Sequence, residues 1–109
     1  HDASAAVKLG AADLINIKLA KSGGFAGANA INAIAAAAGI GCMVGCNAET
    51  RLGTAASAHF IAAHANVRYG DVDSFMLLEE TDWLTGGFEA DGETLTLSDR
   101  PGLGVEVHL

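Results

Sequence analysis

Short apolar runs alternate with segments of helical spacing along the first two thirds of this chain, and this alternation limits its possible folds most. The runs cover residues 14–19, 41–45 and 67–72, with glycine, asparagine or aspartate residues nearby. Apolar runs of this length are typical of buried strands, and the segments between them are long enough for crossover helices. The pattern predicts a β-α-β-α-β order on a parallel sheet, preceded by a helix over residues 2–9. We therefore expect an α/β fold.

The two segments between the predicted strands have the composition of helices. Residues 25–38 are rich in alanine and end before Gly39, a typical helix stop. Residues 49–65 place four apolar side chains at helical spacing, which predicts that one side of this helix is buried: Leu52, Ala56, Phe60 and Ala63.

The last third of the chain indicates extended segments joined by turns. Residues 75–78 are apolar, and the pair Gly86–Gly87 is a break. The alternating run over residues 93–97 predicts a strand that pairs back across a turn at Asp91–Gly92. Residues 100–107 predict a rigid turn that leads into a last extended segment.

The composition indicates a globular chain and argues against nucleic-acid binding. Hydrophobic residues make up 50% of the 109 residues and aromatic residues only 6%, so we expect a core of alanine, isoleucine, leucine and valine. The net charge of −7 is uneven, because residues 70–109 carry ten acidic side chains and one basic side chain. Such a sequence lacks the basic face that nucleic acid requires. Its acidic part is either a solvated surface or a place where a cationic ligand binds.

Cys42 and Cys46 are the only cysteines, and they indicate free thiols. Four residues apart on a strand, they lie about 13 Å from each other, which is too far for a disulfide. A zinc site would need two more ligands, and His59 and His64, five residues apart, fall on different faces of a helix. We therefore expect no metal site built from these residues, and free thiols suit a reducing cytoplasm.

A stretch without charged residues between Lys21 and Glu49 also allows a membrane-spanning interpretation. Against it, Asn29 and Asn32 lie in the middle of the stretch, Gly39 interrupts it, and alanine, which predominates over leucine, inserts poorly. A helix followed by a strand explains the same residues. We therefore expect no membrane segment.

Charged side chains follow each of the three predicted strands. Lys18 lies near the end of the first strand, Glu49 follows the second, and Asp71 and Asp73 close the third. Carboxyl ends of parallel strands share one edge of a sheet, where α/β enzymes place their active sites. Asp71 and Asp73 point the same way on a strand and repel each other unless a cation, either a metal ion or an ammonium group, lies between them. The alternatives are a lysine that extends to solvent, a solvated aspartate pair and a glutamate that interacts with a helix dipole.

In these segments the chain resembles the C-terminal part of the enolase superfamily, in the muconate-lactonizing subgroup and most closely the dipeptide epimerases. The resemblance spans nearly the whole chain and rests on four motifs: ADLINIKLAKSGG from Ala12, GCMVGCNAETRLG from Gly41, DVD from Asp71 and PGLGVEV from Pro101. It implies strands six, seven and eight of the family's modified TIM (β/α) barrel, followed by a tail that returns to a capping domain. We expect residues 1–79 to form the barrel segment and residues 80–109 the tail, as the C-terminal part of a larger protein.

The resemblance also implies a role for each of the four charged residues. Lys18 matches one of two acid/base lysines on opposite faces of the substrate, and Asp71 and Asp73 match a pair that holds the free ammonium group of a dipeptide. Glu49 matches a glutamate after strand seven and is expected to bind substrate. The implied reaction is a 1,1-proton transfer α to a carboxylate, with a magnesium ion that stabilises the enediolate. The magnesium ligands and the second lysine are expected on earlier strands, in an N-terminal remainder of the same enzyme.

Two other interpretations are open. Other members of the subgroup, such as N-acylamino acid racemases, o-succinylbenzoate synthases and muconate cycloisomerases, act on substrates without the ammonium group, so Asp71 and Asp73 argue against them. Alternatively, the chain is a structural fragment without catalytic activity. Asn47 replaces the methionine that is usual in the family before this glutamate region, so the sequence does not predict the side chains of the dipeptide. We expect a cytoplasmic homo-oligomer that binds neither nucleic acid nor membranes.

Overall fold

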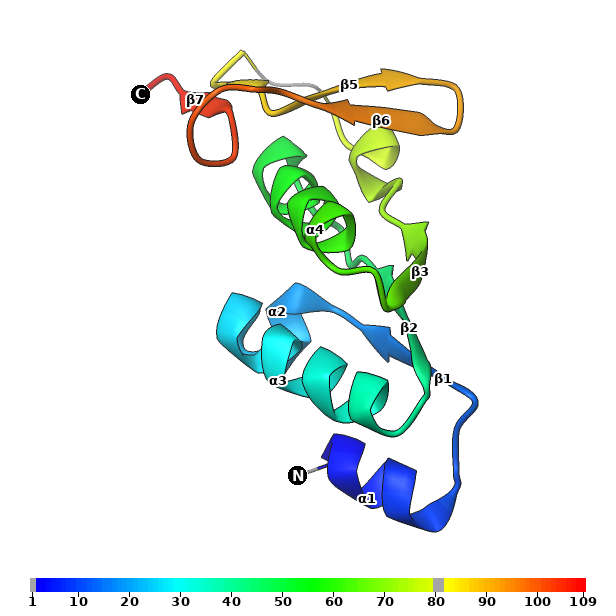
Figure 1. Cartoon of the computed structure of the whole chain (residues 1–109). Coiled ribbons are helices and arrows are strands. Elements are labelled where there is room, and N and C mark those ends of the chain that lie inside the picture. The colour runs from blue at the N-terminus through cyan, green and yellow to red at the C-terminus, as the bar shows by residue number, and fades with distance from the viewer. Residues whose placement is uncertain (1, 80–81) are drawn as a thin grey trace.

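A computed structural model of the chain describes residues 2–79 and 82–109 (Figure 1). Its centre is a parallel sheet of three strands, β1 (Leu14–Ile17), β2 (Gly41–Gly45) and β3 (Val67–Asp71), in the order β1-β2-β3. The predicted α/β fold with a parallel sheet is therefore confirmed. Because the strands run in the same direction, their carboxyl ends share one edge of the sheet.

The two helices that connect these strands cover the same face of the sheet. α3 (Gly24–Ala37) connects β1 to β2, and α4 (Arg51–Ala63) connects β2 to β3. Figure 1 shows both on one side of the strands, as right-handed crossovers require. A shorter helix, α1 (Asp2–Leu9), precedes the first strand and contacts α3. The buried core between helices and sheet consists mainly of small and branched side chains: Ile17, Leu19, Ala28, Ala35, Cys42, Val44, Phe60 and Val67.

The first strand is two residues shorter than predicted. It ends at Ile17, and a single helical turn, α2 (Leu19–Ser22), begins directly after Lys18. The cause is local, because Ser22 forms two hydrogen bonds to the residue that follows the strand. Its hydroxyl donates to the carbonyl oxygen of Lys18 at 2.8 Å, and its backbone N–H donates to the same oxygen at 2.9 Å. Lys18 keeps extended backbone angles, with φ −120° and ψ 117°, at the junction between strand and helix.

The charge-free stretch folds as a helix and a strand, as predicted. Gly27 lies where α3 passes the end of α2, and a β-carbon there would collide with the carbonyl oxygen of Ser22, so this position requires glycine. Asn32 is bonded to Asn66, whose side chain also donates to the carbonyl oxygen of Ile40 at 3.0 Å. In the described residues, the helices are too short or too polar to cross a membrane.

The buried side of α4 differs from the predicted one. Leu52 is 40% exposed and Ala63 is exposed, whereas Phe60 is buried as expected. The helix contacts both the parallel sheet and the C-terminal segment, so it also encloses small and hydroxyl side chains: Thr54, Ala55, Ser57 and Ala58. An apolar pattern does not reveal Thr54 and Ser57, because hydroxyl groups do not contribute to it.

The C-terminal segment forms two small antiparallel sheets. A 3₁₀ turn, η1 (Ser74–Leu77), follows β3. β4 (Leu84–Gly86) pairs with β7 (Val105–Val107), and β5 (Phe88–Asp91) pairs with β6 (Thr94–Leu97). Helix α4 contacts η1, β4, β6 and β7, and so links this segment to the parallel sheet. The first residue of the predicted tail, residue 80, lies outside the described residues.

The predicted hairpin is present, with its turn shifted by one residue. Asp91 pairs with Thr94, so the loop consists of Gly92 and Glu93. Gly92 has a φ of +57°, which two-residue hairpin loops need. The sequence does not predict the pairing of β4 with β7, because each strand is only three residues long and they lie far apart in the chain.

Candidate active site

Three of the four predicted site residues lie at the carboxyl edge of the parallel sheet. Lys18 directly follows β1, Asp71 is the last residue of β3, and Asp73 lies two residues further, before η1. Ile17 is buried in the helix-covered core, so strand alternation directs its neighbours Asn16 and Lys18 to the opposite face. Lys18 therefore points to the face of the sheet away from α3 and α4.

Gly45, at the end of β2, makes room for side chains of the first strand. A β-carbon at this position would lie 2.9 Å from Oδ1 of Asn16 and 3.4 Å from Cε of Lys18. The Lys18 side chain therefore extends across Gly45, whose partner in the next strand is Asp71. The sheet thus directs Lys18 toward the strand that carries Asp71. Lys21, in contrast, is exposed on α2.

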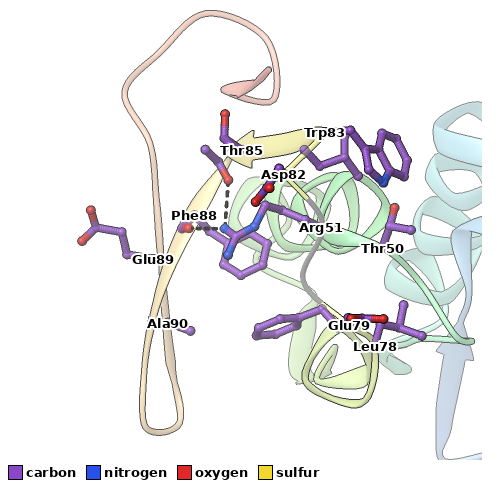
Figure 2. A pocket seen from close by; sticks show the side chains of 13 residues that line it. Thr50, Arg51, Leu78, Glu79, Asp82, Trp83, Thr85, Phe88, Glu89 and Ala90 are labelled. Carbon is purple, nitrogen blue, oxygen red and sulfur yellow. Dashed lines mark hydrogen bonds between the residues drawn. The ribbon is translucent and has the colours of Figure 1, made fainter. Parts of the chain in front are cut away.

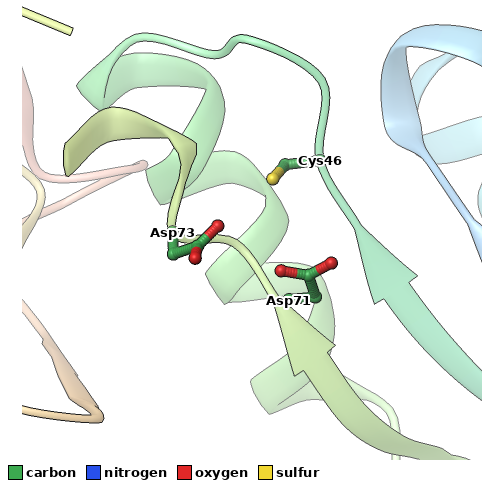
Figure 3. Close-up of side chains that lie close together, drawn as sticks. All are labelled: Cys46, Asp71 and Asp73. Atoms are coloured by element: carbon green, nitrogen blue, oxygen red, sulfur yellow. The ribbon is translucent and has the colours of Figure 1, made fainter. Parts of the chain in front are cut away.

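Two carboxylates and a thiol converge at the ends of β2 and β3 (Figure 3). Ligand atoms of Cys46, Asp71 and Asp73 all lie within 4.8 Å of one another. Two carboxylates this close repel each other, and a cation between them removes the repulsion and adds charge-assisted hydrogen bonds. This group is therefore suited to bind an ammonium group or a metal ion.

The ligand atoms of this group do not suit a magnesium ion. Magnesium prefers octahedral oxygen ligands, whereas a thiol binds softer metals. In the described part of the chain, this is the one group that brings three possible metal ligands together. His59 and His64 are engaged elsewhere, since Nδ1 of each contacts a carbonyl oxygen one helical turn earlier, that of Ala55 at 2.8 Å and that of Phe60 at 2.7 Å.

Glu49 lies in the loop between β2 and α4, and its carboxylate has partners within the protein. Oε1 accepts a hydrogen bond from the N–H of Asn47 at 3.4 Å, and Oε2 accepts one from the Ser57 hydroxyl at 3.4 Å. The backbone N–H of Glu49 donates to Oγ of Ser74 at 3.1 Å. The structure thus directs Glu49 toward α4 and leaves it outside the carboxylate and thiol group of Figure 3.

Both cysteines are free, but their surroundings differ. Cys42 lies in the core, and burial raises the pKa of its thiol, partly offset by a hydrogen bond from Asn66 at 3.6 Å. Cys46 is half-buried and directly follows β2. Cys46 thus lies at the end of a strand, as Lys18 and Asp71 do. The sequence does not select it, because an uncharged thiol at the end of an apolar run resembles a core residue.

A cavity of about 880 Å³ lies between the start of α4, η1 and the strands β4 and β5 (Figure 2). Arg51 forms part of its wall. Nη1 of Arg51 donates to the carbonyl oxygens of Gly86 at 3.0 Å and Phe88 at 2.9 Å, and the guanidinium lies 4.6 Å from the centroid of the Phe88 ring. These contacts attach β4 and β5 to α4. None of the charged strand-end residues lines this cavity, so its size alone does not make it the active site.

A smaller cavity, of about 190 Å³, adjoins the aspartate pair. It lies between β3 and the tip of the hairpin, and its lining includes Asp71, Asp73, Met76 and Glu93. The sequence predicts neither cavity, because both depend on how the C-terminal strands pack against the rest of the chain.

Comparisons with known protein families and curated proteins give consistent results. The family model described as enolase C-terminal domain-like matches residues 1–109. An L-Ala-D/L-Glu epimerase of Bacillus subtilis is 49% identical over 94 residues, which cover 86% of this chain and 25% of that protein. A hydrophobic dipeptide epimerase of Enterococcus faecalis is 45% identical over 107 residues, which cover 96% of this chain and 30% of that protein. Muconate cycloisomerase 1 of Rhodococcus opacus is 39% identical over 110 residues, with coverages of 100% and 29%.

Solved structures show the same similarity. A substrate-liganded complex of the L-Ala-D/L-Glu epimerase from Bacillus subtilis matches with a TM-score of 0.91 and 44% identity, over 98% of this chain and 30% of that one. A dipeptide epimerase from Methylococcus capsulatus, complexed with Mg and the dipeptide L-Arg-D-Lys, matches with a TM-score of 0.90 and 41% identity, with the same coverages. The chain thus spans 25 to 30% of the length of these relatives.

Proposed function

Because the chain belongs to the enolase C-terminal domain-like family, we propose that it is part of a magnesium-dependent dipeptide epimerase. Such an isomerase transfers a proton at the carbon atom α to a carboxylate. The similarity to an L-Ala-D/L-Glu epimerase and to a hydrophobic dipeptide epimerase supports this substrate class. We assign β1, β2 and β3 to strands six, seven and eight of a modified TIM (β/α) barrel.

The observation that carries the proposal is the pair of carboxylates at the end of β3. Asp71 and Asp73 have carboxylate oxygens within 4.8 Å of each other, and both residues are exposed, so a ligand can reach them. A dipeptide carries an ammonium group at one end. This cation removes the repulsion between the two carboxylates of the pair. An N-acylated amino acid has a neutral amide at the same place and gains no such interaction. The pair therefore favours a substrate with a free amino terminus.

Lys18 is the acid/base residue of the proposed reaction on one face of the substrate. Its side chain extends across Gly45 toward the strand of Asp71, so a dipeptide held by its ammonium group would place its interior near the lysine. Inversion at a carbon atom requires removal of the proton from one face and its return on the other. A second acid/base lysine is therefore expected on the opposite side, in the N-terminal remainder of the enzyme.

Magnesium is proposed as the cofactor of the intact enzyme, as the Mg complex of the Methylococcus capsulatus epimerase suggests. The group of Cys46, Asp71 and Asp73 does not suit this ion, so we expect its ligands in the N-terminal remainder. When bound, the ion stabilises negative charge on the substrate carboxylate. Glu49 is left out of the ammonium site, because its carboxylate bonds to Asn47 and Ser57.

The tail is proposed to pack on a capping domain of the same enzyme. Several apolar side chains of residues 80–109 support this, since Trp83 is 45% exposed and Val107 is 49% exposed in the structure. The free thiols of Cys42 and Cys46 agree with a cytoplasmic location. A homo-oligomeric state stays a prediction.

A second candidate is cycloisomerisation. Muconate cycloisomerase 1 of Rhodococcus opacus is 39% identical to this chain over 100% of the length of this chain. That reaction class would leave Asp71 and Asp73 without an ammonium partner. We therefore place it second.

Proton nuclear magnetic resonance in deuterium oxide separates the candidates. The intact enzyme with magnesium should exchange the α-proton of a dipeptide's C-terminal residue for deuterium and form the second epimer. An N-acetylated copy of the same dipeptide should react more slowly by a factor of about ten or more, because it lacks the charge-assisted hydrogen bonds. Equal rates, or conversion of muconate alone, would contradict the proposal.

A further inference from the structure

The loop over residues 46–50 is attached to two other elements through Glu49. One carboxylate oxygen accepts from the N–H of Asn47, within the loop, and the other accepts from the Ser57 hydroxyl on α4. The backbone N–H of Glu49 donates to the Ser74 hydroxyl on η1. This one residue therefore bonds to its own loop, to α4 and to the segment that follows β3.

The hydroxyl partners of Glu49 are held firmly. Ser57 is fully buried, with 0% exposure, and Ser74 is 8% exposed. Glu49 itself lies close to α4. A β-carbon added to Gly53 of α4 would be 3.2 Å from the β-carbon of Glu49. A buried hydroxyl that loses its partner destabilises the local structure, so these bonds restrict how the loop can move.

The restricted segments carry the ligand atoms of the candidate ammonium site. Cys46 opens the loop that Glu49 holds, and Asp73 directly precedes Ser74. The distance between the ends of β2 and β3 is thus fixed on one side by sheet pairing of Gly45 with Asp71 and on the other by the bond from Glu49 to Ser74. Figure 3 shows that the carboxylates and the thiol face each other across this junction.

We propose that Glu49 is a positioning residue, which sets the place of Asp73 through the Ser57 and Ser74 hydroxyls and does not itself bind the substrate. The proposal rests on the proposed function in that Asp73 holds a substrate ammonium group. Each carboxylate oxygen of Glu49 accepts one hydrogen bond within the protein, from Asn47 and from Ser57, and these bonds hold the carboxylate against its own loop and α4.

Amide hydrogen exchange of the intact enzyme tests the structural part without any substrate. In Glu49→Ala, the amide of Asn47 should exchange faster than in the wild type, by a factor of up to about five, because it loses its hydrogen bond to the Glu49 carboxylate. In Ser74→Ala, the amide of Glu49 should exchange faster by a similar factor. Glu49→Gln should exchange like the wild type, because its amide oxygen still accepts from Asn47. Unchanged exchange in both alanine variants would overturn the proposal.

Steady-state kinetics with a dipeptide and its N-acetylated copy tests the functional part. Glu49→Ala, Ser57→Ala and Ser74→Ala should each raise KM for the dipeptide about three- to tenfold, with kcat within about twofold of the wild type. KM for the N-acetylated copy should not change, because that substrate does not use Asp73. Glu49→Gln should retain the wild-type KM.

The opposite pattern identifies a direct substrate contact. If Glu49→Gln is as damaging as Glu49→Ala, while Ser57→Ala and Ser74→Ala behave like the wild type, the negative charge of Glu49 acts on the substrate itself and the proposal is wrong. Absence of dipeptide activity in the wild type would contradict the proposed function, while the exchange rates would still decide whether Glu49 holds the loop.

Discussion

Two adjacent residues at the end of β1 have opposite surroundings in this structure. Ile17 is 1% exposed in the core, whereas Lys18, the next residue, extends across Gly45 on the other face of the sheet. The alternation of strand side chains is enough to explain this difference. A shift of one residue in the strand would bury the ammonium group of Lys18. The proposed role of Lys18 therefore depends on the register of β1.

Replacement of Lys18 by alanine should abolish proton transfer on one face of the substrate only. In the intact enzyme, kcat for epimerisation should fall about 100- to 10,000-fold, the range for loss of a general acid or base. Exchange of the α-proton with deuterium oxide should survive from one epimer and vanish from the other, as observed by proton nuclear magnetic resonance. Equal loss from both epimers, with substrate binding intact, would indicate that Lys18 has a structural or electrostatic role.

Replacement of Gly45 by alanine should impair catalysis more than stability. The added β-carbon would lie 2.9 Å from Asn16 and 3.4 Å from Lys18, whose flexible side chains can move away. We expect a stability change within about 1 kcal/mol, and a fall in kcat of about tenfold or more from the displaced lysine.

The matched control for this variant is Gly41→Ala, at the other end of β2. Its β-carbon would lie 3.0 Å from Nε of Arg68, so it also crowds a flexible side chain, but far from Lys18. Its kcat should equal that of the wild type. If both variants lose activity alike, the effect of Gly45→Ala comes from the sheet and not from Lys18.

Elements with a strong apolar pattern are the ones that the sequence predicts well. β2 has the predicted bounds, and α1 covers the predicted residues 2–9. The end of β1 is wrong by two residues, because a bond from Ser22 to the Lys18 carbonyl is a local detail that a hydrophobic pattern does not contain. For the candidate site, charges at strand ends correctly place Lys18 and the aspartates at the carboxyl edge of the sheet. The orientation of Glu49 depends on hydroxyls of α4 and η1, which the pattern does not contain.

Helix α4 contains a buried hydroxyl group, that of Thr54. Its Oγ1 forms no hydrogen bond within the described residues. Valine has the same shape without the hydroxyl, so Thr54→Val should raise the free energy of unfolding by up to about 1 kcal/mol. Urea denaturation of the intact enzyme measures this, with Thr54→Ala as the control that leaves a cavity and destabilises. A loss of more than about 1 kcal/mol in Thr54→Val would mean that the hydroxyl has a bonding partner.

Strand β2 contributes a pH dependence through Cys42. Burial raises the pKa of this thiol, so the folded state keeps the proton when the unfolded state loses it. The folded state then binds more protons than the unfolded state above pH of about 8.5, and stability falls with rising pH by at most about 1.4 kcal/mol per pH unit. Urea denaturation at pH 7.5 and 9.5 should show a larger loss for the wild type than for Cys42→Ala. The same loss in both would exclude Cys42 as the cause.

The whole molecule is elongated, with extents of 46 × 24 × 21 Å and a radius of gyration of 14.7 Å. A compact domain of this length would have a radius of gyration of about 13 Å. In the described part of the chain, helices α3 and α4 cover one face of the sheet (Figure 1), and the Lys18 side chain extends across Gly45 on the other. The chain also spans 25 to 30% of the length of its relatives, so in the proposed enzyme we expect the other walls of the site in the part of those relatives that this chain does not cover.

The central claim is that Asp71 and Asp73 bind the ammonium group of a dipeptide, and Asp73→Asn tests it most directly. The measurement is kcat/KM of the intact enzyme for a dipeptide and for its N-acetylated copy. Glu93→Gln serves as the control, because Glu93 lines the adjoining cavity but lies outside the group of Figure 3. Loss of one charge-assisted hydrogen bond should lower kcat/KM for the dipeptide about ten- to a hundredfold and leave the value for the N-acetylated copy unchanged. An equal fall for both substrates, or a wild-type preference for the N-acetylated one, would contradict the claim.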